Sequence, residues 1–209
     1  MTQSGTTTAR RRTAHGKQTR QAILKTAVHV ASVEGLEGLS IGRLATELRM
    51  SKSGLFAHFG SKEDLQLAVI DTALEIFTAE VIQPARATSP GIDRLQALCN
   101  AWLSYGERKV FRGGCFFAAV ATEFDSRPGV VRDRLATLMQ QWLNLLEQFI
   151  QEAKDLGKLH SEVDPAQLAF ELIATMWGAN AMLQLYDNQQ VVTQTRTAIA
   201  QRLQSAALE

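Results

Sequence analysis

Residues 51–65, SKSGLFAHFGSKEDL, constrain the fold of this chain most, because they interrupt helical sequence twice within a short distance. Ser51 is a favoured helix N-cap and Gly60 a favoured helix stop, so a short helix is predicted over Lys52–Phe59. Ser61 and Asp64 have the spacing of a capping box and predict that another helix starts immediately. The chain therefore turns sharply here without leaving helical structure.

The segment before this stretch completes a recognisable arrangement. Ile41–Leu48 has apolar residues at helical spacing, and a three-residue turn separates it from the short helix. Ala45 is small where two such helices would cross, and Gly54 lets the second helix approach another molecule closely, at a cost of about 1 kcal/mol relative to alanine. Two short helices joined in this way predict a helix-turn-helix, whose second helix enters the major groove of DNA.

The distribution of charge agrees with a nucleic-acid partner. The whole chain has a formal net charge of +1, but residues 1–62 contain ten basic and three acidic residues, a net +7, which leaves −6 for the remainder. One end of the molecule is thus suited to a polyanion and the other is not.

The rest of the chain predicts an all-α fold. Residues 1–16 are rich in Thr, Ser and Arg without periodicity and predict a disordered basic arm; residues 17–64 form the helix-turn-helix domain and residues 65–209 a larger helical domain. A linker is expected over residues 83–90. Besides the segments above, helices are expected at Lys17–Glu34, from Ser61 toward Val81, and at Ile92–Lys109, Phe116–Glu123, Val130–Asp155, Pro165–Tyr186 and Val191–Ala207.

Residues from Lys17 to about Leu74 resemble the DNA-binding domain of tetracycline-repressor-type (TetR) transcriptional regulators. The resemblance rests on the first helix and on ILKTAVHVASVEGLEGLSIGRLATELRMSKSGLFAHFGSKEDL, residues 23–65. The part of the family pattern Gly-x-Leu-Tyr-x-His-Phe-x-x-Lys that begins at Leu reads here from Leu55 to Lys62, and Gly54 lies directly before it. GGCFFAAVATEFDSRPG and LGKLHSEVDPAQLA are similar to phrases in the effector domains of some members. The resemblance implies a bacterial, homodimeric DNA-binding regulator.

Two positions depart from the family pattern. Phe56 replaces the usual Tyr, so a hydroxyl that would bind phosphate is missing, and Gly42 stands where an Arg often reaches bases. Base reading is therefore expected to involve Lys52, Ser53 and Arg43 instead.

Several polar and small residues are candidates for DNA contact. A lysine in the first turn of a helix opposes the helix dipole, as Lys52 and Lys62 do, and a nearby phosphate would resolve the conflict. The alternative for Lys52 is a solvated side chain, and the alternative for His58 is a cap at the end of its own short helix; DNA contact is favoured for both. Capping or solvated faces likewise account for three others, Ser40, Thr19 and Arg20. The candidate DNA-binding residues are Thr19, Arg20, Ser40, Arg43, Lys52, Ser53, Gly54, Phe56, His58 and Lys62.

The C-terminal domain is rich in large apolar side chains. They form either a plain core or the wall of a pocket for a small ligand that is uncharged or weakly polar, apolar or aromatic. Tyr105, Asn144, Asn180 and Gln184 are candidates for polar groups that point inward. The candidate ligand-binding residues are Trp102, Tyr105, Phe116, Phe117, Val120, Met139, Trp142, Phe170, Met176 and Trp177.

Other functional classes find little support. There is no Gly-x-Ser-x-Gly, no phosphate-binding glycine loop and no Cys/His cluster at zinc spacing, so no metal, cofactor or enzymatic activity is expected. No apolar run is long enough to span a membrane, and no signal peptide is seen. Cys99 and Cys115 are expected to be buried thiols in a reducing cytoplasm, with a disulfide as the alternative.

The sequence thus predicts a cytoplasmic homodimeric repressor that a small ligand releases from a near-palindromic, double-stranded operator. The dimer is expected to form through Asp164–Tyr186 and Gln190–Ala207. Small residues give the first segment a stripe for close approach, and Val192, Ile199 and Leu203 give the second an apolar seam. The alternative is that both faces pack within one chain. The alternatives are an architectural DNA-binding protein without an effector and an all-helical enzyme or carrier.

Overall fold

The computed structural model describes residues 5–208, with side chains from residue 16 onward, and regular structure in this part of the chain is helical. A single antiparallel bridge joins Leu159 to Ala207. The prediction of an all-α fold is confirmed. The helices are α1 (Gly5–Glu34), α2 (Ile41–Leu48), α3 (Lys52–Phe56), α4 (Lys62–Phe77), the π-helix η1 (Thr78–Ile82), α5 (Gln83–Arg86), α6 (Ile92–Glu107), α7 (Phe116–Phe124), α8 (Val130–Asp155), α9 (Pro165–Tyr186) and α10 (Gln190–Ala206).

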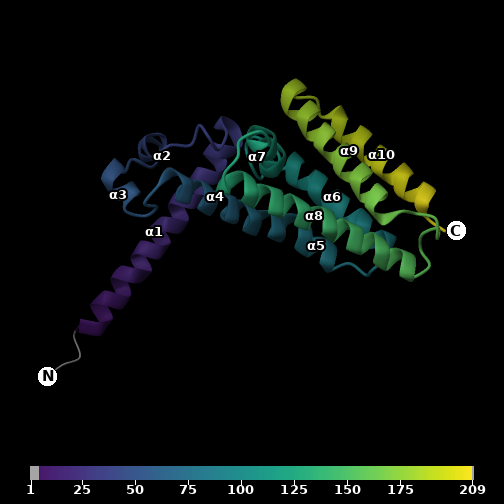
Figure 1. Ribbon diagram of the computed structural model, residues 1–209, viewed down its shortest axis with the longest axis horizontal. Helices are drawn as coiled ribbons and strands as arrows, with labels where there is room; N and C mark the ends of the chain where they lie inside the picture. Colours follow the sequence, from purple (N-terminus) through teal and green to yellow (C-terminus); the bar gives the residue numbers. More distant parts are fainter. Residues whose placement is uncertain (1–4, 209) are drawn as a thin grey trace.

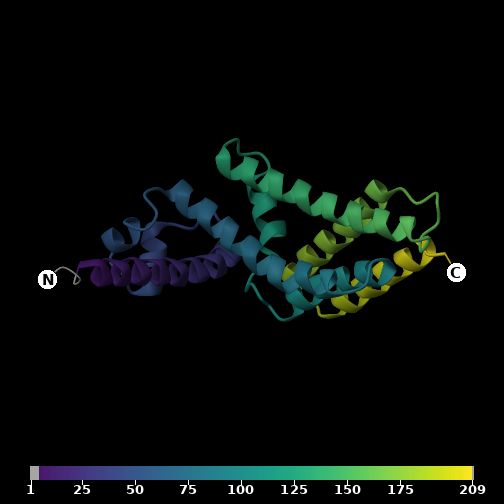
Figure 2. The same cartoon turned by 90° about the horizontal axis from the view of Figure 1, so that it is seen from below.

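The helices form two groups, which α4 connects (Figure 1). At one end α2 and α3 pack with α1 and the start of α4; at the other end α5 to α10 form a larger bundle. Seen from below, α8 lies on one side of the continuous α4–α5 segment and α10 on the other, and α9 packs against both α8 and α10 (Figure 2). α1 also contacts α7, so the two groups meet along a second seam besides α4.

Side-chain caps fix the helix starts that the sequence predicts. The hydroxyl of Ser40 accepts a hydrogen bond from the Arg43 amide, and Ser51 and Ser61 cap α3 and α4 in the same way. The carboxylate of Asp164 accepts from the backbone of α9. Each cap satisfies a backbone amide that has no partner within its helix.

Two predicted helix ends differ in the N-terminal group. α1 continues back to Gly5, so residues 5–16 are helical where a disordered arm was expected; extending an existing helix needs no new nucleus, and Ala and Arg favour it. Residues 1–4 lie outside the described residues. α3 ends at Phe56 and not at Phe59, because the amides of His58 and Phe59 bond three residues back, in a tighter turn that leads to Gly60 at φ +70°.

The expected linker over residues 83–90 is largely helix. The helix that begins at Lys62 passes through the π-turn η1 into α5 and ends only at Arg86. Pro84 lies at the start of α5, a position where a helix tolerates proline.

The helix pair α9–α10 also differs in part from expectation. Val192, Ile199 and Leu203 are buried within the chain, where α10 packs against α6 and α9. The apolar seam predicted for a subunit interface is therefore used inside the protomer.

The loop between α6 and α7 approaches the backbone of α1 very closely. The Gly113 amide donates to the hydroxyl of Ser32 (3.2 Å), and a Cβ on Gly113 would lie only 1.7 Å from the Ser32 carbonyl oxygen. Real Cβ atoms do not come so close to backbone, so only glycine fits at this position.

We expect Gly113→Ala to lower the free energy of unfolding by about 3 kcal/mol, because the loop must move away from α1. Gly106→Ala in α6 is the matched control, since its Cβ would meet nothing within 4 Å; a helical alanine there should preserve stability or raise it by up to about 1 kcal/mol. Chemical denaturation measures both. Equal stability of the two variants would contradict the close packing of loop and α1.

Candidate nucleic-acid interface and adjoining cavity

The pair α2–α3 has the geometry of a helix-turn-helix. Arg49 ends α2 in the left-handed conformation (φ 53°), and the Met50 amide bonds to the Ala45 carbonyl (2.9 Å), which closes the turn. Leu44 and Leu55 are fully buried between the helices and the rest of this group. Packing of these apolar residues holds α3 in one orientation.

The outer surface of α3 exposes three candidates for DNA contact: Lys52, Ser53 and Phe56. Lys52 makes no ion pair with any residue whose side chain the structure describes. Its side chain passes over Gly42, where a Cβ would lie 3.5 Å from Lys52 Cε. Gly42 thus leaves room for a lysine that reaches outward from the neighbouring helix.

Gly54 has a local role that the sequence did not indicate. A Cβ at this position would lie 3.0 Å from the hydroxyl of Ser51, the residue that caps α3 through the Gly54 amide. Glycine therefore keeps the cap intact, in addition to the predicted close approach to a partner.

Two basic candidates are held by carboxylates of the same group of helices. Arg43 forms ion pairs with Glu34 (2.7 Å) and Glu47 (2.8 Å). The ammonium of Lys62 lies 2.7 Å from Glu37, and this hydrogen bond lowers the pKa of the Glu37 carboxyl. Contact with a phosphate would require each side chain to exchange or share its acidic partner.

The remaining candidates lie around the same surface. Ser40 caps α2, Thr19 is half-buried on α1, and the guanidinium of Arg20 lies 5.1 Å from the centroid of the Phe59 ring. His58 follows α3 and is half-buried beside Phe59. Arg20 thus packs α1 against the turn that follows the exposed helix.

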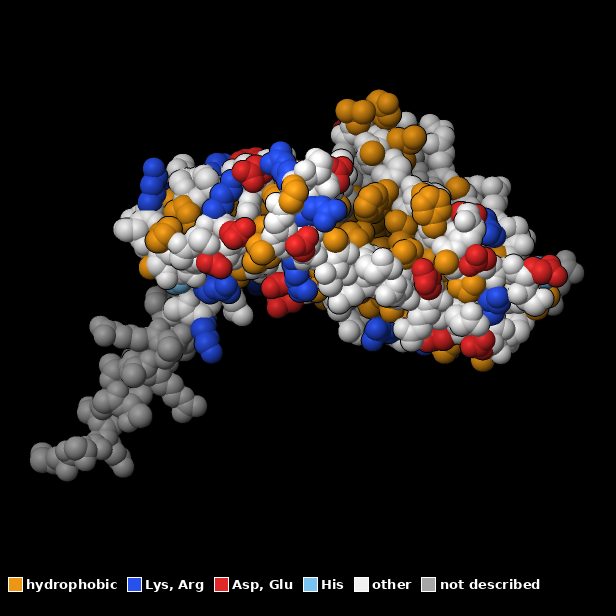
Figure 3. Space-filling model, in the orientation of Figure 1, with side chains coloured by type: hydrophobic (Ala, Val, Ile, Leu, Met, Phe, Trp, Pro, Cys, Tyr) orange, Lys and Arg blue, Asp and Glu red, His pale blue; other side chains and the backbone are white. Residues whose placement is uncertain are grey.

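The larger group of helices contains a cavity of about 490 Å³, within the range of roughly 300–1,000 Å³ typical of small-molecule sites. It borders α8 and α9, and Figure 3 shows apolar side chains in a hollow between these helices. Of the residues predicted to bind a ligand, its wall contains Trp102, Phe117, Met139, Trp142, Met176 and Trp177.

Four predicted ligand residues do not line this cavity. Phe116 and Val120 are fully buried in the core, and Tyr105 borders a much smaller void of about 10 Å³ between α6, α9 and α10. Phe170 is 62% exposed on α9, so its assignment to the pocket is wrong. The helical pattern indicated that these side chains were apolar but not which way they point.

Sequence reasoning missed the part of the wall that α4, η1 and α5 supply. Leu74, Phe77 and Ile82 add apolar surface, and the polar rim consists of Thr78, Gln83, Arg86, Gln141, Asn144 and Gln148. The positions in α4, η1 and α5 were predicted to be connecting helix and linker, whereas Gln141, Asn144 and Gln148 lie on α8, which was predicted as a helix. Of the polar candidates, Asn144 lies on the rim, but Asn180 accepts a hydrogen bond from the Cys115 amide (2.8 Å) at the start of α7.

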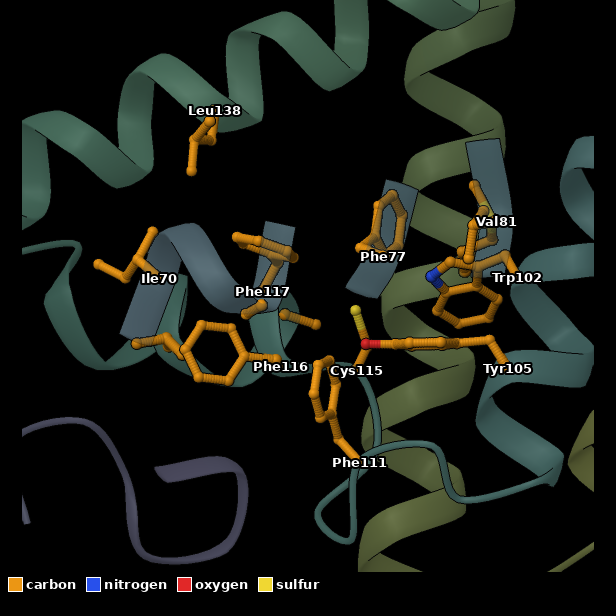
Figure 4. Packing of buried hydrophobic residues seen from close by; sticks show 14 of the residues in the cluster. Ile70, Phe77, Val81, Trp102, Tyr105, Phe111, Cys115, Phe116, Phe117 and Leu138 are labelled. Carbon is orange, nitrogen blue, oxygen red and sulfur yellow. The ribbon is translucent and has the colours of Figure 1, made fainter. Parts of the chain in front are cut away.

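Aromatic rings and buried thiols define the chemistry of the interior. Phe77 makes edge-on contacts with Phe117 (5.7 Å), Trp142 (5.1 Å) and Tyr105 (5.7 Å). The Tyr105 hydroxyl lies beside Cys115 and has no conventional hydrogen-bond partner (Figure 4). Burial raises the pKa of Tyr105 and of the Cys115 thiol, so both groups stay protonated and the interior is uncharged.

Both cysteines are free, buried thiols, and burial raises the pKa of Cys99 to about 12. Among residues 16–208, whose side chains the structure describes, no three His, Cys, Asp or Glu side chains gather so as to hold a metal ion. No described helix has the length and apolar character that crossing a membrane requires.

Comparison with known proteins gives consistent results. Residues 23–69 match the model for bacterial regulatory proteins of the tetR family, and residues 91–199 match the tetracyclin repressor-like C-terminal domain. The HTH-type transcriptional repressor DhaR of Mycobacterium sp. strain GP1 is 23% identical over 88% of this chain and 91% of its own.

Solved structures extend the similarity to the whole fold. A TetR transcriptional regulator from Chloroflexus aurantiacus J-10-FL is 26% identical, with a TM-score of 0.86 over 93% of this chain and 98% of its own. AibR, solved in complex with isovaleryl coenzyme A and operator DNA, is 22% identical, with a TM-score of 0.68 over 86% of this chain and 95% of its own. The structure has a helix-turn-helix group that one helix joins to a helical domain with a cavity, and a family model matches each of these two parts. The chain therefore belongs to the TetR family of transcriptional regulators.

Proposed function

We propose that the protein is a cytoplasmic, homodimeric repressor that a small apolar or aromatic ligand releases from a near-palindromic operator. The observation that carries this proposal is that one helical segment, α4–η1–α5, begins in the helix-turn-helix group and ends in the wall of the 490 Å³ cavity. An architectural DNA-binding protein needs no such cavity, and we therefore favour the regulator.

The exposed surface of α3 supports direct DNA contact. Lys52 and Ser53 lie in its first turn, the part of a recognition helix that faces base edges. Lys62 lies in the first turn of α4, where helix amides and the lysine together would attract a phosphate. Phe56 offers apolar contact to a thymine methyl or a sugar.

The operator should be found by selecting bound duplexes from a random pool, and binding should weaken as salt rises. If the dimer neutralises about eight phosphates, log affinity should fall against log salt with a slope of about −7. Lys52→Ala with Lys62→Ala should weaken binding and flatten this slope. Lys109→Ala with Lys158→Ala, which removes two exposed charges from the other group of helices, is the control and should change neither. Unchanged affinity after the first pair would refute the interface.

The aromatic wall of the cavity supports an apolar or aromatic ligand. Phe77, Phe117 and Trp142 present ring edges and faces, and Arg86 is the charged member of the lining, at its polar rim. AibR, a protein of this fold, was solved in complex with both operator DNA and a small molecule, isovaleryl coenzyme A, which supports a small-molecule partner in addition to DNA. Half-sites on DNA lie about 34 Å apart, so a shift of a few ångström in the separation of two recognition helices would disturb simultaneous docking.

Reciprocity provides the test of ligand release. The fluorescent probe 1-anilinonaphthalene-8-sulfonate, which binds apolar cavities, should bind at least about tenfold more weakly when the selected duplex is present, within the usual range of allosteric coupling. Leu145→Trp on the cavity wall should abolish this binding, whereas Ala136→Trp on the exposed surface of α8 should not. Fluorescence titration measures each affinity. Equal probe affinity with and without the duplex would contradict release by a cavity ligand.

An exposed apolar face on α9 supports the proposed dimer. Phe170, Met182, Leu185 and Tyr186 are each more than half exposed, and Figure 3 shows apolar side chains at the C-terminal end of this helix. Gly178 lies on the same face, and a Cβ there would meet nothing within 4 Å. A monomer rarely leaves such a stripe in water, so a second copy that packs α9 and the outer side of α10 would cover it.

Gly178→Arg should therefore yield a folded monomer with much weaker affinity for the selected duplex, because the new side chain fits the isolated chain but obstructs its partner. Ala136→Arg on α8 introduces the same charge at an exposed position and should remain dimeric. Sedimentation equilibrium gives the mass of each variant. A stable dimer of Gly178→Arg would rule out this face as the interface.

A further inference from the structure

A carboxylate of α7 holds the backbone of the helix-turn-helix group. Glu123 Oε2 accepts a hydrogen bond from the Leu36 amide (2.7 Å), and Glu123 Oε1 accepts one from the Glu37 amide (2.8 Å). One side chain of the larger group of helices, which contains the cavity, thus binds two consecutive amides in the α1–α2 loop. Hydrogen bonds to an ionised acceptor are stronger than those between neutral groups, and two such bonds also fix the orientation of the loop relative to α7.

The loop is shaped to receive this carboxylate. Gly35 has φ +81°, and a Cβ there would lie 2.8 Å from Glu123 Oε1. Any other residue would be strained in this conformation and would press against the carboxylate. Glycine at position 35 therefore permits both the end of α1 and the contact with α7.

The loop that Glu123 holds is connected to the start of α4. The Leu36 carbonyl accepts from the buried side chain of Gln66 (3.0 Å), and the Glu37 carboxylate pairs with Lys62 (2.7 Å). Both backbone groups of Leu36 are thus hydrogen-bonded, the amide to Glu123 of α7 and the carbonyl to Gln66 of α4. Movement of Glu123 would move the loop that positions Lys62 and the start of α2.

The other end of α7 lies at the cavity. Phe117 is part of the cavity wall, and six residues of helix, about 9 Å, separate it from Glu123. The Asn180 side chain anchors the Cys115 amide just before α7 begins. A short helix held at its start and pushed at Phe117 will tilt, and its far end carries the carboxylate.

We propose that Glu123 is the positioning residue that transmits occupancy of the cavity to the DNA-binding group. With the cavity empty, its carboxylate holds the α1–α2 loop and so fixes the orientation of α2 and α3. A ligand that displaces Phe117 tilts α7 and lengthens the two hydrogen bonds of Glu123. The helix-turn-helix group can then leave the orientation in which it fits the operator. This inference rests on the proposed ligand-responsive repression.

Other contacts across the seam keep the two groups together when Glu123 is changed. Arg134 of α8 pairs with Asp71 of α4 (2.7 Å), and Gly113 bonds to Ser32. Loss of the Glu123 contact should therefore alter coupling without unfolding the protein, which makes the proposal testable by substitution.

The decisive experiment compares Glu123→Gln with Glu107→Gln. The side-chain NH₂ group of a glutamine at position 123 would face one of the two backbone N–H groups, so one of the two hydrogen bonds would be lost. Glu107 pairs with Arg196 within the larger group of helices, and Glu107→Gln is therefore the matched control. For each protein, 1-anilinonaphthalene-8-sulfonate is titrated with and without the selected duplex. We expect the ratio of the two affinities to be at least about ten in the wild type and in Glu107→Gln, and within about twofold of one in Glu123→Gln.

The outcomes separate this inference from the proposed function. A wild-type ratio above about ten that Glu123→Gln retains would overturn the role of Glu123 and leave ligand release intact. A wild-type ratio of one would contradict ligand release itself. Hydrogen exchange gives a second measurement: the Leu36 and Glu37 amides should exchange faster in Glu123→Gln and in Glu123→Asp than in Glu107→Gln. Unchanged exchange at both amides would overturn the contact on which the inference rests.

Discussion

The structure depends on the shared packing of α4, which belongs to both groups of helices. Its first turn is capped by Ser61 and packs with α1, so it moves with the helix-turn-helix. Its last turn contributes Leu74 and Phe77 to the cavity and continues into η1 and α5. Leu65, Val69, Ile70 and Ala73 are fully buried along its length, and burial of such side chains contributes roughly 1.5–3 kcal/mol each for the larger ones. The helix therefore cannot shift at one end without disturbing packing at the other.

Aromatic rings around Phe77 form much of the cavity wall. Phe117 and Trp142 make edge-on contacts with Phe77, a favoured geometry for aromatic pairs, and Trp102 and Trp177 also line the cavity. The π-turn η1 contributes Thr78 and Ile82 to the wall, and irregular turns of this kind often accompany functional sites. The same interior contains the Tyr105 hydroxyl without a conventional partner, and an unpaired buried hydroxyl costs free energy that a purely structural core would avoid.

Local signals in the sequence predicted most of the fold. The residues that line the cavity could not be predicted in the same way, because they depend on the direction in which each side chain points. The serine caps at positions 40, 51 and 61 and the glycine stops act within one helical turn, so the helix-turn-helix could be recognised directly. Phe170 and Trp177 are both aromatic residues of α9, but only the second faces the cavity, and no local pattern distinguishes them. The contact of Glu123 with the amides of Leu36 and Glu37 joins segments up to 87 residues apart, and one sequence does not reveal such a pairing.

In the mechanism that we propose, occupancy of the cavity changes the separation of the two recognition helices of the dimer through α4 and α7. Spin labels on Ala57→Cys test it most directly, because this exposed position follows α3 and the native thiols are buried. Pulsed electron spin resonance on the dimer should show one narrow distance distribution with the selected duplex. Without duplex, the cavity probe should shift this distance by several ångström, because α4 and α7 move with the wall. An identical distribution in the probe-bound and duplex-bound states would contradict the account.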